Sequence, residues 1–74
     1  MITITFRIKD KDMDVMVLPQ PRISEVLKTL KENHMIFFQI EKLMIYSMRN
    51  RQYVSQRITF KQAGIYTGDI LTLK

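Results

Sequence analysis

Hydrophobic spacing changes sharply along this chain of 74 residues, and the change lies at Pro19 and Pro21. Before the prolines, apolar and polar residues alternate over Ile2–Ile8, which is the period of a strand with one buried face. After them, apolar residues recur at positions i, i+3, i+4 and i+7, which is the period of one helix face. Neither proline can donate a backbone hydrogen bond to a neighbouring strand, so the prolines end the strand-like part. The sequence therefore predicts a fold that mixes strands with a helix.

The helix is the clearest element, and Asn33 is a suitable stop signal for it. Charged residues lie away from its apolar stripe, as in a helix that packs one face against a core. The stripe consists of Ile23, Val26, Leu27 and Leu30.

Further strands are predicted on both sides of the helix. Asp14–Leu18 resumes extended character after a polar break, so it forms a hairpin with the first strand. No Asn-Gly or Asp-Gly is present there, which favours a loop longer than two residues. Later in the chain, Gln52–Ser55 and Ile70–Leu73 read as short strands, and Ile58–Ala63 reads as a short helical turn closed by glycine.

Residues 34–48 are ambiguous, because their apolar run fits either a buried helix or a loop followed by a strand. We prefer the loop and strand. In that interpretation Leu43 and Ile45 face the core, while Met44 and Tyr46 face the opposite side of the sheet.

The order strand, strand, helix, strand, short strand, strand predicts an α+β fold, with one main helix across a mixed sheet of four to five strands. We expect residues 1–74 to form one domain, since a chain this short leaves no room for a second.

This order and spacing resemble the ubiquitin-like β-grasp proteins over the whole chain. The helix segment Pro21–Leu27 and the run Ile58–Leu73 resemble, more specifically, the YukD/EsaB family of the bacterial type VII (WXG100) secretion system. The run x-T-[LF]-x-x-A-G-I-x-x-G-D-I-L-x-L is similar to the end of that family and of related domains in membrane secretion subunits. The resemblance implies a small cytoplasmic accessory protein that works beside a membrane-bound ATPase and other subunits. It would meet the inner face of the cell membrane only indirectly.

Many ubiquitin-like domains act through a flexible Gly-Gly tail that becomes covalently attached. Here the last glycine, Gly68, lies in a predicted turn, and Leu71–Lys74 reads as a strand. We therefore expect no covalent targets and an action through surface side chains.

Charge is unevenly distributed along the chain. The net charge of +5 comes from residues 42–74, where Asp69 is the single acidic residue. A one-sided positive charge favours acidic partners.

One candidate site is the outward face of the sheet. If Leu43, Leu71 and their inward neighbours fill the core, the residues between them point outward together, because alternate strand residues face opposite sides. An exposed apolar patch with a basic rim is typical of protein interfaces. The predicted patch contains Met44, Tyr46, Ile70 and Thr72, bordered by Arg7, Lys42 and Lys74.

A second candidate is a basic arm of Arg49, Arg51 and Arg57 around Tyr53. Arginines next to an aromatic ring are able to bind single-stranded nucleic acid by charge and stacking. A small basic nucleic-acid-binding module is therefore the alternative function, although no recognised RNA motif accompanies the arm.

Nothing in the sequence supports an enzyme, a cofactor or a metal site. Cysteine is absent, which excludes thiol nucleophiles and thiolate ligands. Asp10–Asp14 imitates the start of a calcium loop, but Val15 and Pro21 stand where that loop needs glycine and a bidentate acid. His34, the single histidine, has no readable partner for catalysis, and we expect it at the end of the helix.

Overall fold

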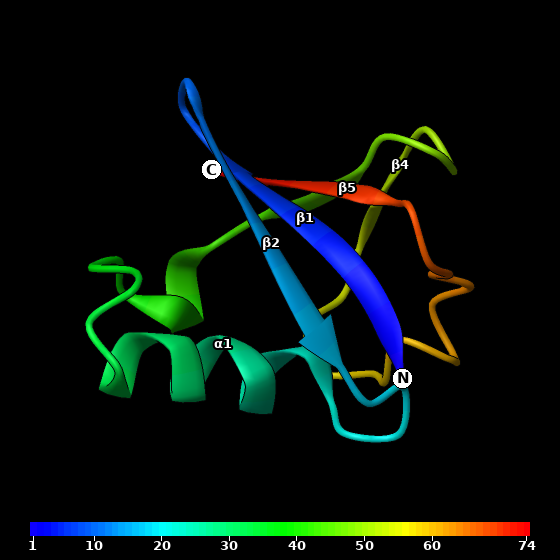
Figure 1. The fold of residues 1–74 in the computed structure, drawn as a ribbon, viewed down its shortest axis with the longest axis horizontal. Coiled ribbons are helices and arrows are strands. Elements are labelled where there is room, and N and C mark those ends of the chain that lie inside the picture. Colours follow the sequence, from blue (N-terminus) through cyan, green and yellow to red (C-terminus); the bar gives the residue numbers. More distant parts are fainter.

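The computed structural model describes all of residues 1–74 and shows five strands with one α-helix across one face of the sheet (Figure 1). This confirms the predicted order of elements. The elements are β1 (Ile2–Ile8), β2 (Lys11–Val17), α1 (Ile23–Glu32), the 3₁₀ turn η1 (Ile40–Lys42), β3 (Ile45–Ser47), β4 (Gln52–Val54) and β5 (Ile70–Leu73).

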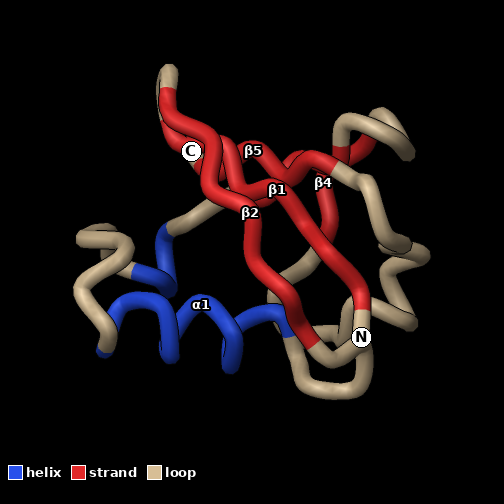
Figure 2. Tube along the Cα trace, viewed as in Figure 1, coloured by secondary structure: helices blue, strands red, loops and turns tan.

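The strands lie in the order β2-β1-β5-β3-β4. Figure 2 shows the strands in red on one side of α1. At the centre of the sheet β1 runs parallel to β5, with Thr5 opposite Ile70 and Ile8 opposite Leu73. All other neighbouring strands are antiparallel. The predicted mixed sheet is therefore confirmed, with five strands.

The loop of the first hairpin is shorter than predicted. Only Lys9 and Asp10 connect the strands, because Ile8 already pairs with Lys11. Lys9 takes a φ of 55°, a left-handed conformation that glycine or asparagine adopts more readily. The prediction of a longer loop is wrong because it relied on the absence of glycine. Pairing along the whole of both strands compensates for one strained lysine.

The helix begins and ends where its sequence signals predict. No side chain caps its first turn. Instead, the amides of Ile23 and Ser24 donate to the carbonyls of Ile58 and Gln56, in a segment that crosses the helix start. At the other end, His34 takes a φ of 60° and its amide donates to Lys31, while the next amide donates to Leu30. These two bonds form a Schellman motif with His34 in the left-handed position, which confirms that the histidine lies at the helix end.

The ambiguous stretch after the helix is a loop, the short turn η1 and then strand β3. Leu43 and Ile45 are buried, whereas Met44 is exposed and Tyr46 is half-buried. The preferred interpretation is therefore confirmed, with a single 3₁₀ turn as the helical part.

Residues 59–64 form a single helical turn, with side-chain hydrogen bonds at its start and a glycine at its end. Thr59 and Gln62 bond each other's backbone amides through their side chains, at 3.0 Å each, as in a capping box. Gly64 ends the turn with a φ of 71°, where a side chain would be strained. The amide Nδ2 of Asn50 donates to the Gly64 carbonyl and ties this turn to the β3–β4 connection.

The core lies between the sheet and α1 and receives side chains from every layer of the fold. Every second residue of the strands, together with the apolar stripe of the helix, supplies most of the core. The strand residues between them therefore lie on the other face of the sheet. Neither helical element has the length and apolar character needed to cross a bilayer. The buried apolar residues are Ile4, Phe6, Val17, Ile23, Leu27, Leu30, Ile36, Ile40, Leu43, Ile45, Phe60, Ile65, Leu71 and Leu73.

Candidate functional site

The face of the sheet that α1 leaves uncovered carries a continuous row of outward residues. Strand pairing places Arg7 beside Thr72, Thr72 beside Tyr46, and Tyr46 beside Tyr53. The row therefore crosses four of the five strands. Three of its members belong to the predicted patch or its border, and the structure brings them together.

The two tyrosines form the best-defined contact on this face. Their ring centroids lie 5.0 Å apart at an interplanar angle of 71°, the edge-to-face arrangement that aromatic pairs prefer. The ammonium of Lys74 lies 5.8 Å from the centre of the Tyr53 ring and 3.5 Å from its hydroxyl. Sequence reasoning placed Tyr53 with the basic arm, but the structure places it here, opposite Tyr46.

A second row of outward residues lies two positions along each strand from the first row and contains Thr5, Ile70 and Met48. Ile70 pairs with Thr5, and its carbonyl accepts a hydrogen bond of 2.9 Å from the amide of Met48. Met48 is 43% exposed and was absent from the predicted patch. The alternation along this segment could have identified it, because Met44, Tyr46 and Met48 are every second residue and every second residue of a strand faces the same side of the sheet.

Met44 extends the patch to the residue before the start of β3. Its amide and carbonyl exchange hydrogen bonds of 3.0 Å with Lys74, so the pairing of β3 with β5 continues past both strands. The side chain of Met44 is 55% exposed. We call the set Met44, Tyr46, Met48, Tyr53, Ile70 and Thr72 the sheet patch.

The border of the sheet patch is less basic than predicted. Arg7 lies on this face, but its Nε and Nη2 donate to both carboxylate oxygens of Asp12, at 2.8 and 3.1 Å. The hydrogen bond from Arg7 lowers the pKa of Asp12, and the same bond raises the pKa of Arg7. Its charge is thus already balanced within the β1–β2 hairpin.

Lys42 lies on η1 rather than on a strand, and η1 contacts α1 on the other side of the sheet. Of the three predicted border cations, Lys74 alone adds an unbalanced charge directly to the sheet patch.

The predicted basic arm is divided between two places. Arg49 and Arg51 lie in the turn between β3 and β4, where the guanidinium of Arg49 contacts the carbonyl of Thr67 and lies 5.9 Å from the Tyr66 ring. Arg57 lies beyond β4, in the segment that crosses the start of α1. A single nucleic-acid surface made of all three arginines and Tyr53 is therefore not formed.

Sequence reasoning missed a buried carboxylate behind the sheet patch. Asp69 is fully buried and accepts hydrogen bonds from the hydroxyl of Ser47 at 2.7 Å and from the amides of Arg49 and Ile70 at 3.1 and 2.8 Å. These bonds hold the β3–β4 turn against the start of β5. The one acidic residue of the basic half of the chain is thus a structural residue.

The calcium-like run Asp10–Asp14 is part of the paired β1–β2 hairpin, and no cluster of three or more acidic or histidine side chains that could hold a metal exists in the structure. Asp12 is engaged by Arg7, and Asp14 accepts a hydrogen bond of 2.6 Å from the Thr5 hydroxyl.

No protein-family model matches this chain, and no curated protein matches its sequence. The fold, in contrast, matches many solved structures.

The ubiquitin-like domain of an Arabidopsis thaliana protein matches with a TM-score of 0.77 and 15% identity, over 99% of this chain and 74% of that one. The UBL domain of Plasmodium falciparum Dsk2 matches with a TM-score of 0.73 and 16% identity, over 99% and 97%. The EccD5 ubiquitin-like domain from Mycobacterium xenopi matches with a TM-score of 0.66 and 17% identity, over 99% and 91%.

The TM-scores establish a common fold, but sequence identities this low do not assign the chain to a family. Together with the parallel central strands and the single helix across the sheet, these matches show that the chain has the ubiquitin-like β-grasp fold.

Proposed function

We propose that this chain is a ubiquitin-like protein-interaction module that serves a bacterial type VII secretion system. It acts in the cytoplasm as an accessory or regulatory subunit, beside the membrane-bound ATPase, without becoming covalently attached to other proteins. The observation that carries the proposal is the sheet patch, a set of exposed and half-exposed apolar side chains on the face that α1 leaves uncovered.

The composition of the sheet patch suits a protein partner. Aromatic residues and methionine are enriched in protein interfaces, and charged residues are depleted at their centres. The centre of this patch contains two tyrosines and Ile70, and its nearest free cation, Lys74, lies at the margin. A partner therefore meets an apolar centre with one positive charge beside it.

The secretion system is supported by two observations of unequal weight. The run Ile58–Leu73 resembles the end of the YukD/EsaB family and of related domains in membrane secretion subunits. The likeness of the fold to the EccD5 domain agrees with that resemblance. Action without covalent attachment is supported by β5, whose residues pair on both sides within the sheet.

The test is a pull-down from native cell envelopes with the wild-type chain and Met44→Glu. Subunits of the secretion machine, including its ATPase, should be retained by the wild type and lost with the variant. The matched control is Met16→Glu, since Met16 is 66% exposed on β2, the edge strand at the opposite side of the sheet. Equal retention by both variants would remove the sheet patch as the binding site, and retention of other proteins only would remove the secretion system.

A further inference from the structure

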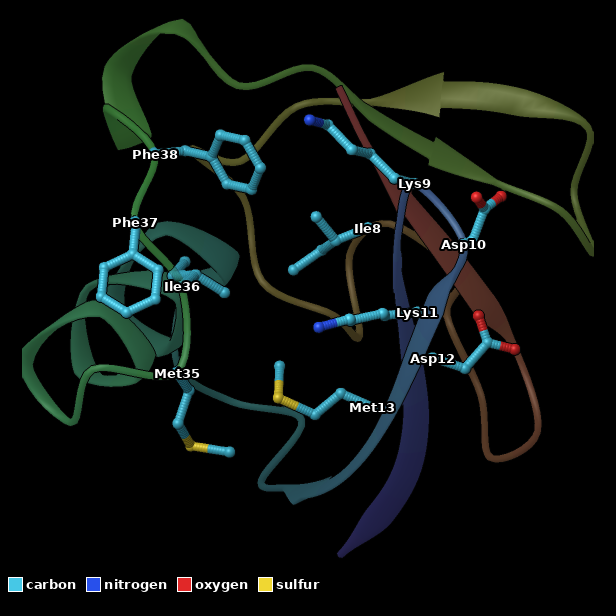
Figure 3. A pocket seen from close by; sticks show the side chains of 10 residues that line it. All are labelled: Ile8, Lys9, Asp10, Lys11, Asp12, Met13, Met35, Ile36, Phe37 and Phe38. Atoms are coloured by element: carbon cyan, nitrogen blue, oxygen red, sulfur yellow. The ribbon is translucent and has the colours of Figure 1, made fainter.

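A cavity of about 580 Å³ opens between the tip of the β1–β2 hairpin and the segment that follows α1 (Figure 3). It lies at the β2 edge of the molecule, whereas the sheet patch is centred on β3, β4 and β5. We call it the hairpin groove. Its apolar lining residues are Ile8, Met13, Met35, Ile36, Phe37 and Phe38.

The turn at the end of α1 creates the wall opposite the hairpin. Because His34 takes a left-handed conformation, the chain reverses there, and Met35–Phe38 faces the hairpin tip (Figure 3). Ile36 is buried, but Phe37 is 81% exposed, the largest exposed fraction of any bulky apolar side chain in the protein. An exposed ring beside a ready cavity is apolar surface that an occupant would cover.

The positively charged side chains of the hairpin face the groove, and the negatively charged ones face away from it. The side chains of Lys9 and Lys11 point across it toward the phenylalanine wall, whereas Asp10 and Asp12 point away (Figure 3). The only salt bridge in the structure joins Arg7 to Asp12, so neither lysine is paired with a carboxylate. The groove therefore combines an apolar lining with two free positive charges.

The shape of the adjacent surface indicates an extended occupant. β2 is an edge strand that pairs only with β1, so one side of its backbone is open to another chain. A second cavity of about 380 Å³ lies farther along β2, between α1 and the last residues of the strand, Val15–Val17, with Leu18 after them. Two cavities along one open strand edge suit a polypeptide better than a compact small molecule.

We propose that the hairpin groove binds an extended segment of a partner protein that carries acidic residues next to large apolar ones. The carboxylates pair with Lys9 and Lys11, and an apolar side chain fills the space between Ile8, Ile36 and the phenylalanines. The segment continues along the open edge of β2. This site is separate from the sheet patch and does not depend on the secretion system.

The experiment uses a synthetic peptide with Leu-Ile-Leu-Phe between two blocks of glutamate, titrated into isotopically labelled protein and followed by NMR. Amide shifts should concentrate in Ile8–Met13 and Met35–Phe38. A matched peptide with lysine blocks, and another with serine in place of the four apolar residues, should bind at least about tenfold more weakly. Shifts located elsewhere, or equal binding of the lysine peptide, would overturn the proposal.

Variants of the protein test which side chains are used. Lys9→Glu with Lys11→Glu should weaken binding about tenfold at low salt, and Phe37→Ser should weaken it at all salt concentrations. The matched control is Lys28→Glu with Lys31→Glu, which makes the same charge change on exposed positions of α1. Equal weakening by the control pair would show that only net charge matters and would contradict the assignment. Met44→Glu should leave peptide binding unchanged, which separates this test from that of the sheet patch.

Two other occupants are outcomes of the same experiment. Sodium oleate tests whether any apolar anion suffices: saturation of the same amides by oleate, with no response to the peptide, would refute a polypeptide ligand. Sedimentation of the protein alone tests a second copy of this chain. A dimer that Phe37→Ser dissociates would likewise refute a separate partner.

Discussion

The hydroxyl of Ser47 donates a hydrogen bond of 2.7 Å to the carboxylate of Asp69, and neither side chain is exposed. The same hydroxyl accepts a bond of 3.1 Å from the amide of Asn50, and the carboxylate accepts two further amides. This small polar cluster joins β3, the β3–β4 turn and β5. It lies directly behind the sheet patch and fixes the strands that present it.

Replacing Asp69 by alanine should lower the free energy of unfolding by about 2–4 kcal/mol, because three donors lose their acceptor in a buried place. Ser47→Ala should cost about 1–2 kcal/mol, and the double variant should cost less than the sum, since both remove the same bond. Urea unfolding measures all three. The control is Asp14→Ala, which removes an exposed carboxylate, and an equal loss there would deny the cluster a special role.

The salt bridge of Arg7 with Asp12 predicts a pH dependence of stability. The pKa of Asp12 is lowered in the folded protein, chiefly by the hydrogen bond from Arg7, so the ionised form binds its proton less readily than in the unfolded chain. The resulting stability is present above the ordinary pKa of 3.8 and is lost as the pH falls through the lower folded value.

Wild type should therefore exceed Asp12→Asn in unfolding free energy near neutral pH, and the difference should vanish in strong acid. Urea titrations across the acid range measure it. Because both side chains are exposed, added salt should also reduce the difference. A difference for Asp12→Asn that stays constant across the acid range would contradict the assignment.

The left-handed conformation of His34 predicts a stabilising substitution. His34→Gly should raise stability by about 0.5–1 kcal/mol, because glycine adopts a φ of 60° without strain. His34→Val should lower it, since a β-branched side chain is least tolerated there. Thermal unfolding followed by circular dichroism measures both. His34→Ala is the reference, because it also lacks the imidazole, and a glycine variant less stable than the alanine variant would contradict the left-handed assignment.

The pairing of β5 on both sides predicts slow exchange of its amide hydrogens. Leu71 and Leu73 are buried between β1 and β3, and the amide of Lys74 donates to Met44. These amides should exchange at least about a hundredfold more slowly than those of Phe37 and Gln39, which donate to no backbone carbonyl. Hydrogen exchange by NMR gives the rates. Fast exchange over the last four residues would mean that β5 is mobile and that the sheet patch is not preformed.

Charge reversal at Arg49 and Arg51 should slow association with the partner of the sheet patch more than it speeds dissociation, because exposed charges mainly steer encounter. Surface plasmon resonance at low and high salt separates the two rates. Arg57→Glu is the control, since Arg57 lies near the start of α1 and away from that turn. If all three reversals slow association equally, net charge alone is responsible.

Most of the fold was predictable because the alternation of buried and exposed residues is visible in the sequence even of short strands. β3 contains only three residues, yet the inward positions of Leu43 and Ile45 and the outward positions of Met44 and Tyr46 were correct. The hairpin loop was predicted wrongly because Lys9 adopts a conformation that its side chain disfavours. Local propensity gives no sign of such a residue when the strain is compensated by strand pairing.

The site was predicted in part, for a related reason. Parity located four residues of the sheet patch, but cross-strand pairing decided that Tyr53 and Met48 join them. Burial of Asp69 could not be foreseen, since aspartate is usually exposed and two of its three donors, from Ser47 and Arg49, lie 22 and 20 residues earlier in the chain. The hairpin groove depends on the chain reversal at His34, which brings together residues far apart in sequence.

The parallel pairing of β1 with β5 has a consequence for biosynthesis. Thr5 and Ile70 are neighbours in the middle of the sheet although nearly the whole chain separates them. During translation the hairpin and α1 emerge early, but β1 has one empty flank until the residues of β5 leave the ribosome. The nascent chain therefore exposes an unfinished sheet edge for most of its synthesis, and contacts of such long sequence separation are slow to form.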